Sequence, residues 1–240
     1  MPSDAPASAC ALSDAMAALS QALPRGRQRR KAERPQELLE AALDLFVEKG
    51  LAATRAEDVA HRAGVSKGTL YLYFPSKDEL FKAVVRAHLS DAISAGDELA
   101  DQFSGTTSQL LSLLAETWWH RVGSSKAAGL LSIIVSEARA FPDVAQFYVD
   151  EVVAPSHALL SRVIRRGITR GEFRNLDVTS VVHGLIAQAQ FLALYRQCTA
   201  ACSTNPAPLD PHLFMATQIE LVLKGLELPA PSSAPASHQS

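Results

Sequence analysis

Residues 54–80 hold the feature that most constrains the fold of this chain. A small residue, Ala60, and a glycine, Gly64, stand four positions apart, where two short helices could touch and then turn. Together with the apolar positions around them, this spacing predicts two short helices that cross at a steep angle over a shared core. The apolar residues expected to point inward are Val59, Ala63, Val65, Leu70 and Tyr73.

Helix boundaries on both sides of this pair follow from residue types that cap and break helices. Apolar positions with a period near 3.6 predict a first helix over residues 35–50, with a proline in its first turn. Thr54 and Ser66 are placed to cap the second and third helices. The sequence Ser-Lys-Asp-Glu at 76–79 is typical of a capping box and predicts a longer fourth helix that ends near residue 95.

The pattern beyond residue 96 stays helical and lacks the alternation that a strand needs. With 48% hydrophobic and 20% charged residues, the composition suits a soluble helical protein. The further helices are expected near 107–122, 125–140, 143–170 (kinked at Pro155), 177–200 and 211–225. The prediction is an all-α fold in which a three-helix domain at 25–80 is joined by a long helix to a larger helical domain at 81–226, with flexible tails at 1–24 and 227–240.

Positive charge is concentrated early in the chain. The whole protein has a net charge of −2, yet residues 25–90 contain 13 Lys and Arg against 9 Asp and Glu. Most of this excess comes from residues 25–34, which include Arg29, Arg30 and Lys31. Such a run is either a solvated charged surface or an arm that binds phosphate groups.

The outer face of the third helix has the chemistry of a major-groove reader. Lys67 can donate to guanine O6 and N7, and Gly68 allows the backbone to approach base edges. Thr69 offers both a hydroxyl and a methyl group, while the Tyr71 phenol can reach a phosphate or a thymine methyl group. Core packing is the alternative for the aromatic residues of this helix, above all for Phe74.

Phosphate contacts are expected where helices begin, because free amides and the helix dipole favour an anion there. Thr54 and Ser66 occupy such positions, and Lys77 follows at the next helix start.

These residues together resemble the signature of the TetR (tetracycline-repressor-like) family. The resemblance rests on Ala60-x-x-Ala63-Gly64-Val65-Ser66-Lys67-Gly68-Thr69-Leu70-Tyr71-x-Tyr73-Phe74-x-Ser76-Lys77-Asp78-Glu79-Leu80. It implies an N-terminal helix-turn-helix head that binds a DNA operator, a C-terminal domain that binds a small-molecule effector, and a homodimer that acts most often as a repressor. Leu72 departs from the pattern, because many members have a second aromatic residue there. The residues that inherit DNA-contact roles are Thr54, Arg55, Lys67, Gly68, Thr69, Tyr71, Tyr73 and Lys77.

Two features of the C-terminal half fit these expectations. The apolar stripes of the helices near 177–200 and 211–225 are wider than one buried face requires, which favours a helical dimer interface. Aromatic and polar residues of the domain could line an effector cavity; ordinary core packing is the alternative for each one alone, and the set together with the family resemblance favours a pocket. The candidate pocket residues are Trp118, Trp119, His120, Phe141, Phe147, Tyr148, Gln188, Phe191 and Tyr195.

Other classes of function find little support. The seven histidines lack metal-ligand spacing, and no phosphate loop or nucleophile elbow is present, so neither an enzyme, a metal site nor a cofactor is expected. A protein-binding helical module would leave both the basic arm and the outer face of Lys67–Tyr73 without a purpose. No apolar run approaches the roughly 18 residues of a membrane span, and the few cysteines suit the cytoplasm.

Two smaller clusters of residues each allow two interpretations. Arg162, Arg165, Arg166 and Arg170 form either a solvated face or a site for an anion or a second DNA contact. Cys198 and Cys202 are either buried thiols or a redox sensor.

Overall fold

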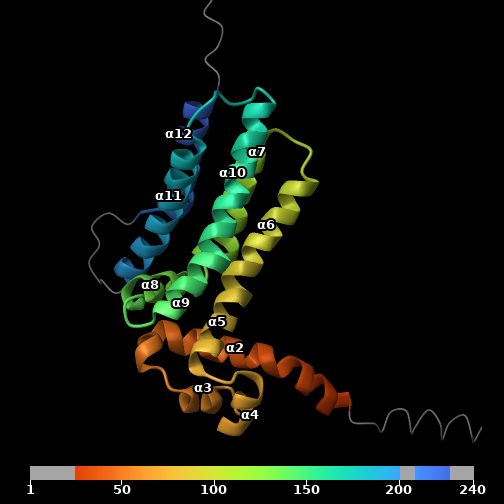
Figure 1. Cartoon of the computed structure of the whole chain (residues 1–240), viewed down its shortest axis with the longest axis vertical. Coiled ribbons are helices and arrows are strands. Elements are labelled where there is room, and N and C mark those ends of the chain that lie inside the picture. Colours follow the sequence, from red (N-terminus) through yellow and green to blue (C-terminus); the bar gives the residue numbers. More distant parts are fainter. Residues whose placement is uncertain (1–24, 201–208, 228–240) are drawn as a thin grey trace, which may run out of the picture.

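The computed structural model describes residues 25–200 and 209–227, and for residues 25–33 and 200 it describes the backbone alone. Within these ranges the chain is helical, and its one β feature is an isolated bridge between Phe173 and Glu227. A small head, which contains α2, α3 and α4, lies at one end of a taller helical bundle (Figure 1). The predicted all-α fold, with a helix-turn-helix head and a larger helical domain, is therefore confirmed.

The head consists of α2 (Arg25–Ala53), α3 (Ala56–Arg62) and α4 (Lys67–Tyr73). Gly50 and Gly64 have φ angles of +82° and +65°, which only glycine adopts without strain, so both mark turns as predicted. The predicted start of the first helix was wrong, because α2 begins ten residues before Pro35. Arg and Lys are good helix formers, and a proline removes only one hydrogen bond from the helix that continues through it.

Ser66 and Ser76 cap their helices as predicted, but the capping box predicted at 76–79 is only half formed, because the Glu79 carboxylate pairs with Lys82. The Ser66 and Ser76 hydroxyls accept hydrogen bonds from the Thr69 and Glu79 amides, at 3.1 Å in each case. The prediction for Thr54 was wrong, because Arg55 is the N-cap of α3 and makes no side-chain capping bond.

A long connector joins the head to the bundle through α5 (Lys77–Val85), the π-helical segment η1 (Arg86–Ser90) and α6 (Asp91–Gln102). It continues past Gly96, where we expected it to stop. Gly96 is buried, and a β-carbon there would lie 3.1 Å from Leu159 Cδ2. The glycine is thus explained by close packing between helices and not by a helix end.

The bundle is completed by three groups of elements. The first is α7 (Thr107–Trp118) with the π segment η2 (Trp119–Gly123) and α8 (Ala128–Glu137). The second is α9 (Pro142–Tyr148), η3 (Val149–Val153) and α10 (Ala154–Thr169), in which the wider π turn stands directly before Pro155. The third is α11 (Val178–Ala200) and α12 (Pro211–Leu226), which lie side by side (Figure 1).

Buried apolar residues form two clusters that do not coincide with the two predicted domains. The first cluster joins the head to α8 and includes Phe46, Leu70 and Ile134. The second lies between α7, α10, α11 and α12 and includes Ile164 and Phe173. The head therefore shares its core with part of the bundle, and the domain boundary at 80/81 stays a prediction.

Helix α11 has an unusual composition for a helix at the surface. Its stretch Val178–Thr199 is long and apolar enough to cross a membrane by length and composition, with a mean hydropathy of 1.3, and 22% of that window is buried. The sequence shows no uninterrupted apolar run here, because glutamines and a histidine interrupt the stretch. Much of the apolar surface of α11 is thus uncovered in one copy of the chain.

Candidate nucleic-acid interface and ligand cavity

Helix α4 presents one face to the core and the opposite face to solvent. Leu70 is fully buried and anchors the helix, and Tyr73 is half-buried against the same core. Ser66, Lys67, Gly68 and Tyr71 are exposed, and Thr69 is half-buried. The structure thus brings the predicted base-contacting residues together on one accessible surface.

Lys67 makes the principal ionic contact on this surface. Its ammonium group pairs with the Glu57 carboxylate of α3 and lies 5.8 Å from the centre of the Tyr71 ring. The hydrogen bond between the two charged groups raises the pKa of Lys67 and lowers that of Glu57. Lys67 is therefore firmly cationic, and its side chain is held next to Tyr71.

Two other predicted contact residues have partners inside the protein. Thr54 is buried, and its hydroxyl donates to the carbonyl oxygens of Leu45 and Gly50 at 3.2 and 2.6 Å. The Lys77 ammonium donates to the carbonyl oxygens of Leu51 and Ala52 at 2.7 and 3.1 Å. Their phosphate contacts stay predictions.

Arg55 is exposed at the N-cap of α3. Arg29, Arg30 and Lys31 lie on the first turns of α2, in the part of the helix whose backbone alone is described. The predicted arm is thus an extension of a helix.

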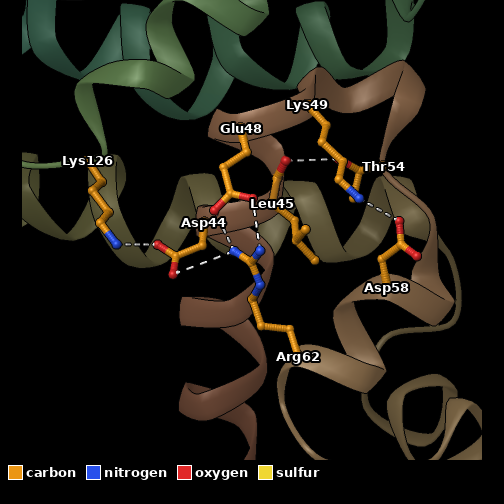
Figure 2. A network of polar contacts seen from close by, with 8 residues as sticks. All are labelled: Asp44, Leu45, Glu48, Lys49, Thr54, Asp58, Arg62 and Lys126. Carbon is orange, nitrogen blue, oxygen red and sulfur yellow. Dashed lines mark hydrogen bonds and ion pairs between the residues drawn. The ribbon is translucent and has the colours of Figure 1, made fainter. Parts of the chain in front are cut away.

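A network of charged residues joins the head to the bundle (Figure 2). Arg62 of α3 donates to both carboxylate oxygens of Glu48 at 2.6 and 2.9 Å and lies 4.0 Å from Asp44. Asp44 also pairs with Lys126, which precedes α8, at 2.6 Å. Lys49 and Asp58 form a second bridge between α2 and α3 at 3.0 Å. Paired charges therefore fix α3 on α2 and connect α2 to the bundle.

The end of α2 is also held by Glu137, the last residue of α8. Its carboxylate accepts hydrogen bonds from the amides of Leu51 and Ala52 at 2.9 and 2.7 Å. The Lys77 ammonium binds the carbonyl oxygens of the same two residues. One acidic and one basic side chain, from α8 and α5, therefore both bind the backbone of the last turn of α2. We call this arrangement, made of Leu51, Ala52, Lys77 and Glu137, the hinge clamp.

The bundle contains a cavity with an empty volume of about 1180 Å³, part of which opens to solvent. All three π segments contribute to its wall, through Leu89, Val122 and Val152, which fits the frequent occurrence of π turns at functional sites. None of its described lining residues is charged. The polar groups of the lining are Thr117, Trp118, Tyr148, Ser156, Gln188, Gln190 and Gln218.

Tyr148 and Gln190 form a polar pair in this wall. Burial raises the pKa of Tyr148, and a hydrogen bond with the Gln190 side chain opposes that shift. The phenol is neutral at physiological pH and can donate or accept a hydrogen bond.

Three of the nine predicted pocket residues line the cavity: Trp118, Tyr148 and Gln188. The other six lie elsewhere. Trp119 is buried under the Arg196 guanidinium and beside His212, and His120 is exposed. Phe141 and Phe147 lie beneath Lys77 and Lys82 near the head, and Phe191 and Tyr195 stack together on α11.

Sequence reasoning missed most of the cavity wall, which is aliphatic. Leu131 of α8 and Met215 and Ile219 of α12 line the cavity, but their apolar periodicity is the same as that of core residues. The one sequence feature that could have indicated an aliphatic cavity wall is the width of the apolar stripes on α11 and α12. From the sequence alone, those stripes are interpreted as a dimer interface.

The arginine cluster on α10 mostly has internal partners. Arg162 pairs with Asp97 and Asp101 of α6, and Arg166 donates to the carbonyl oxygens of Phe103 and Gly105. Cys198 is exposed on α11, whereas Cys202 lies outside the described residues.

Comparison with known sequences finds two family profiles, each of which matches a separate part of the chain. The profile of the tetR family of bacterial regulatory proteins matches residues 38–84. The profile of the C-terminal domain of AefR-like transcriptional repressors matches residues 109–204.

Individual relatives extend over most of the chain. The HTH-type transcriptional repressor KstR2 of Rhodococcus jostii is 32% identical over 151 residues, which cover 62% of this chain and 72% of KstR2. The structure of the ketosteroid regulator KstR2 of Mycobacterium tuberculosis has a TM-score of 0.58 and 25% identity, and covers 82% of this chain and 96% of that one. The structure of the FadR regulator of Bacillus subtilis, solved in complex with stearoyl-CoA, has a TM-score of 0.64 and 19% sequence identity. The match covers 80% of this chain and 99% of FadR.

Proposed function

The chain belongs to the TetR family of DNA-binding transcriptional regulators, which are not enzymes, and we propose that it is a homodimeric repressor released from a palindromic operator by a small-molecule ligand. One observation carries this proposal. Helix α8 contributes Leu131 to the cavity wall and, from its last residue, binds the last turn of α2, directly before α3. A ligand that shifts α8 would therefore act directly on the DNA-binding head.

The DNA interface consists of the outer face of α4, the starts of α3 and α5, and the basic extension of α2. Base contacts fall to Lys67, Gly68, Thr69 and Tyr71, where the exposed surface matches the needs of the major groove. Phosphate contacts fall to Arg29, Arg30, Lys31, Thr54, Arg55, Ser66, Tyr73 and Lys77. Lys67 must exchange its pairing with Glu57 for a contact to DNA, so the ion pair also keeps its side chain in place before binding.

The dimer interface lies on α11 and α12. Exposed residues with helical spacing form a stripe on α11 that includes Ala187, Phe191 and Leu194, and the exposed face of α12 includes Leu213 and Leu221. Leu213 and Leu221 have 66% and 60% of their surface exposed, which is unfavourable for leucine unless a partner covers it. A four-helix seam would cover these residues and remove the apolar surface of α11 from water.

The ligand is predominantly apolar and carries no charge where the cavity encloses it. A carboxylate inside this wall would lack a cationic partner among the described lining residues, and burying an unpaired charge is very costly. The Tyr148–Gln190 pair can bind one hydroxyl or carbonyl group. A long acyl chain, like that of the stearoyl-CoA bound to the Bacillus subtilis relative, has this chemistry.

As a soluble regulator of this family, the protein is proposed to act in the cytoplasm, where it meets both the operator and the ligand.

A binding assay with selected DNA tests the function. The protein is used to enrich duplexes from a random library, and affinities for the enriched sequence are measured at fixed salt, because affinity for DNA depends steeply on it. We expect a near-palindromic sequence, loss of specific binding in Lys67→Ala and Tyr71→Ala, and normal binding in Arg165→Ala, which removes an exposed charge on α10. Normal binding by the first two variants would contradict the proposal.

A second assay tests the ligand response. Acyl thioesters and neutral lipids are added to the protein–DNA complex, and release is followed by fluorescence anisotropy. Release by a charged polar metabolite, with no response to apolar molecules, would contradict the assignment of the cavity.

A further inference from the structure

Leu72 is the most exposed of the large apolar residues described, with 85% of its surface accessible. It lies on α4, between Tyr71 and Tyr73, and no function has so far been assigned to it. Other exposed apolar residues, such as Leu213 and Leu221, belong to the proposed dimer interface. Leu72 is on the head and has no such explanation.

The geometry of α4 places Leu72 at the centre of its outer face. Two residues turn a helix by about 200°, so Leu72 points almost opposite to the buried Leu70. Gly68 stands four residues earlier on the same face, and side chains of a helix lean toward its N-terminus. Leu72 thus stands on the same face as a residue without a side chain, and a β-carbon on Gly68 would have only Ser66 Oγ within 4 Å, at 3.8 Å, so the space beside Leu72 is open.

The groups around this apolar patch are polar. Around the helix, Thr69 lies about 60° from Leu72 on one side and Tyr71 about 100° from it on the other, with Lys67 beyond Tyr71. A major groove read by such a face offers mainly hydrogen-bond donors and acceptors, and its apolar group is the 5-methyl of thymine. The apolar patch formed by Leu72 beside Gly68 thus has the size and polarity to contact one methyl group. The polar side chains around it can contact the edges of neighbouring bases.

We propose that Leu72 reads the 5-methyl group of a thymine in each half of the operator. This inference rests on the proposed DNA binding by α4 and adds a specificity-determining residue to it. Phosphate binding is excluded for an aliphatic side chain, so the residue takes a different role from an aromatic one at this position.

The test removes the methyl group from the DNA and the side chain from the protein in turn. Each thymine of the enriched duplex is replaced by deoxyuridine, symmetrically in both halves, and affinity is measured for the wild-type protein and for Leu72→Ala. For one thymine pair the wild-type affinity should fall about fourfold per half-site, the factor expected for one buried methyl group. The Leu72→Ala variant should bind the normal duplex more weakly and be insensitive to that replacement.

Two controls make the outcome decisive. Leu72→Met keeps an apolar side chain of similar reach and should retain sensitivity to the methyl group, and thermal unfolding should be the same for all three proteins because Leu72 is exposed. If Leu72→Ala discriminates thymine from deoxyuridine as well as the wild type does, another residue such as Tyr71 reads the methyl group and the inference is wrong. If no thymine matters to the wild type, it is also wrong, whereas failure to enrich any sequence would overturn the proposed function itself.

Discussion

Replacing Glu137 with alanine should weaken both the fold and the DNA-binding activity. The substitution removes the acceptor of two backbone amides, of which the Leu51 amide is partly buried and the Ala52 amide is exposed. A hydrogen bond to a charged group contributes about 1.5–3 kcal/mol, and an exposed one contributes less. We therefore expect a loss of about 2 kcal/mol, most of it from the Leu51 amide.

Such a loss corresponds to a fall in the unfolding temperature of about 4–8 °C for a protein of this size. Differential scanning calorimetry and operator affinity should be measured on the same samples. Affinity should fall because the amides of the last turn of α2 then lose their link to α8, while only the Lys77 bonds to its carbonyl oxygens remain from the hinge clamp. Glu137→Gln retains one acceptor oxygen and should lie between the wild type and Glu137→Ala.

Glu98→Ala provides the matched control. Glu98 is exposed on α6 and has no hydrogen bond or ion pair with any residue that the structure describes. Its replacement removes the same charge without touching the hinge clamp. If Glu137→Ala unfolds at the wild-type temperature and binds the operator normally, the clamp does not stabilise the head.

Three further variants test other parts of the structure. Gly50→Ala should destabilise the protein by about 1–3 kcal/mol in thermal unfolding, because φ +82° with ψ 169° is a region that essentially only glycine adopts and the new β-carbon would lie 2.6 Å from Glu137 Oε1; an unchanged unfolding temperature would contradict this. Leu221→Asp should convert the dimer to a monomer in sedimentation velocity at micromolar concentration, and a persistent dimer would place the interface elsewhere. Ala189→Phe should fill part of the cavity and abolish release by ligand while operator binding persists, and a normal ligand response would argue against the cavity as the effector site.

The head could be predicted from sequence because its signals are local. Gly64 and the Ser66 cap lie within a few residues of the elements that they define. Gly96 misled the same reasoning, since its close contact is with Leu159, which lies 63 positions away. Helix boundaries can therefore be predicted where residues nearby in the sequence determine them. They cannot be predicted where the residue type is determined by packing against a helix distant in the sequence.

The cavity was harder to predict for a chemical reason. Its wall is mainly aliphatic, and residues such as Leu131 have the same pattern as residues of a filled core. Polarity pointed to Gln188 and Tyr148, which line the cavity, whereas the aromatic Trp119 and Phe141 pack elsewhere. The Glu137 contact joins positions 86 residues apart, and nothing in either segment indicates the other.

The hinge clamp bears on how far the head can serve as an exchangeable module. A chimaera that grafts a foreign head onto this bundle would bring its own α2, while the acid that completes the turn at Leu51 and Ala52 remains behind on α8. The graft also needs a carboxylate at position 44 to meet Lys126. In engineered biosensors, a head and an effector domain should therefore be compatible when the residues of the hinge clamp and the pair at positions 44 and 126 match. A mismatch could be corrected by a substitution in either the head or the bundle.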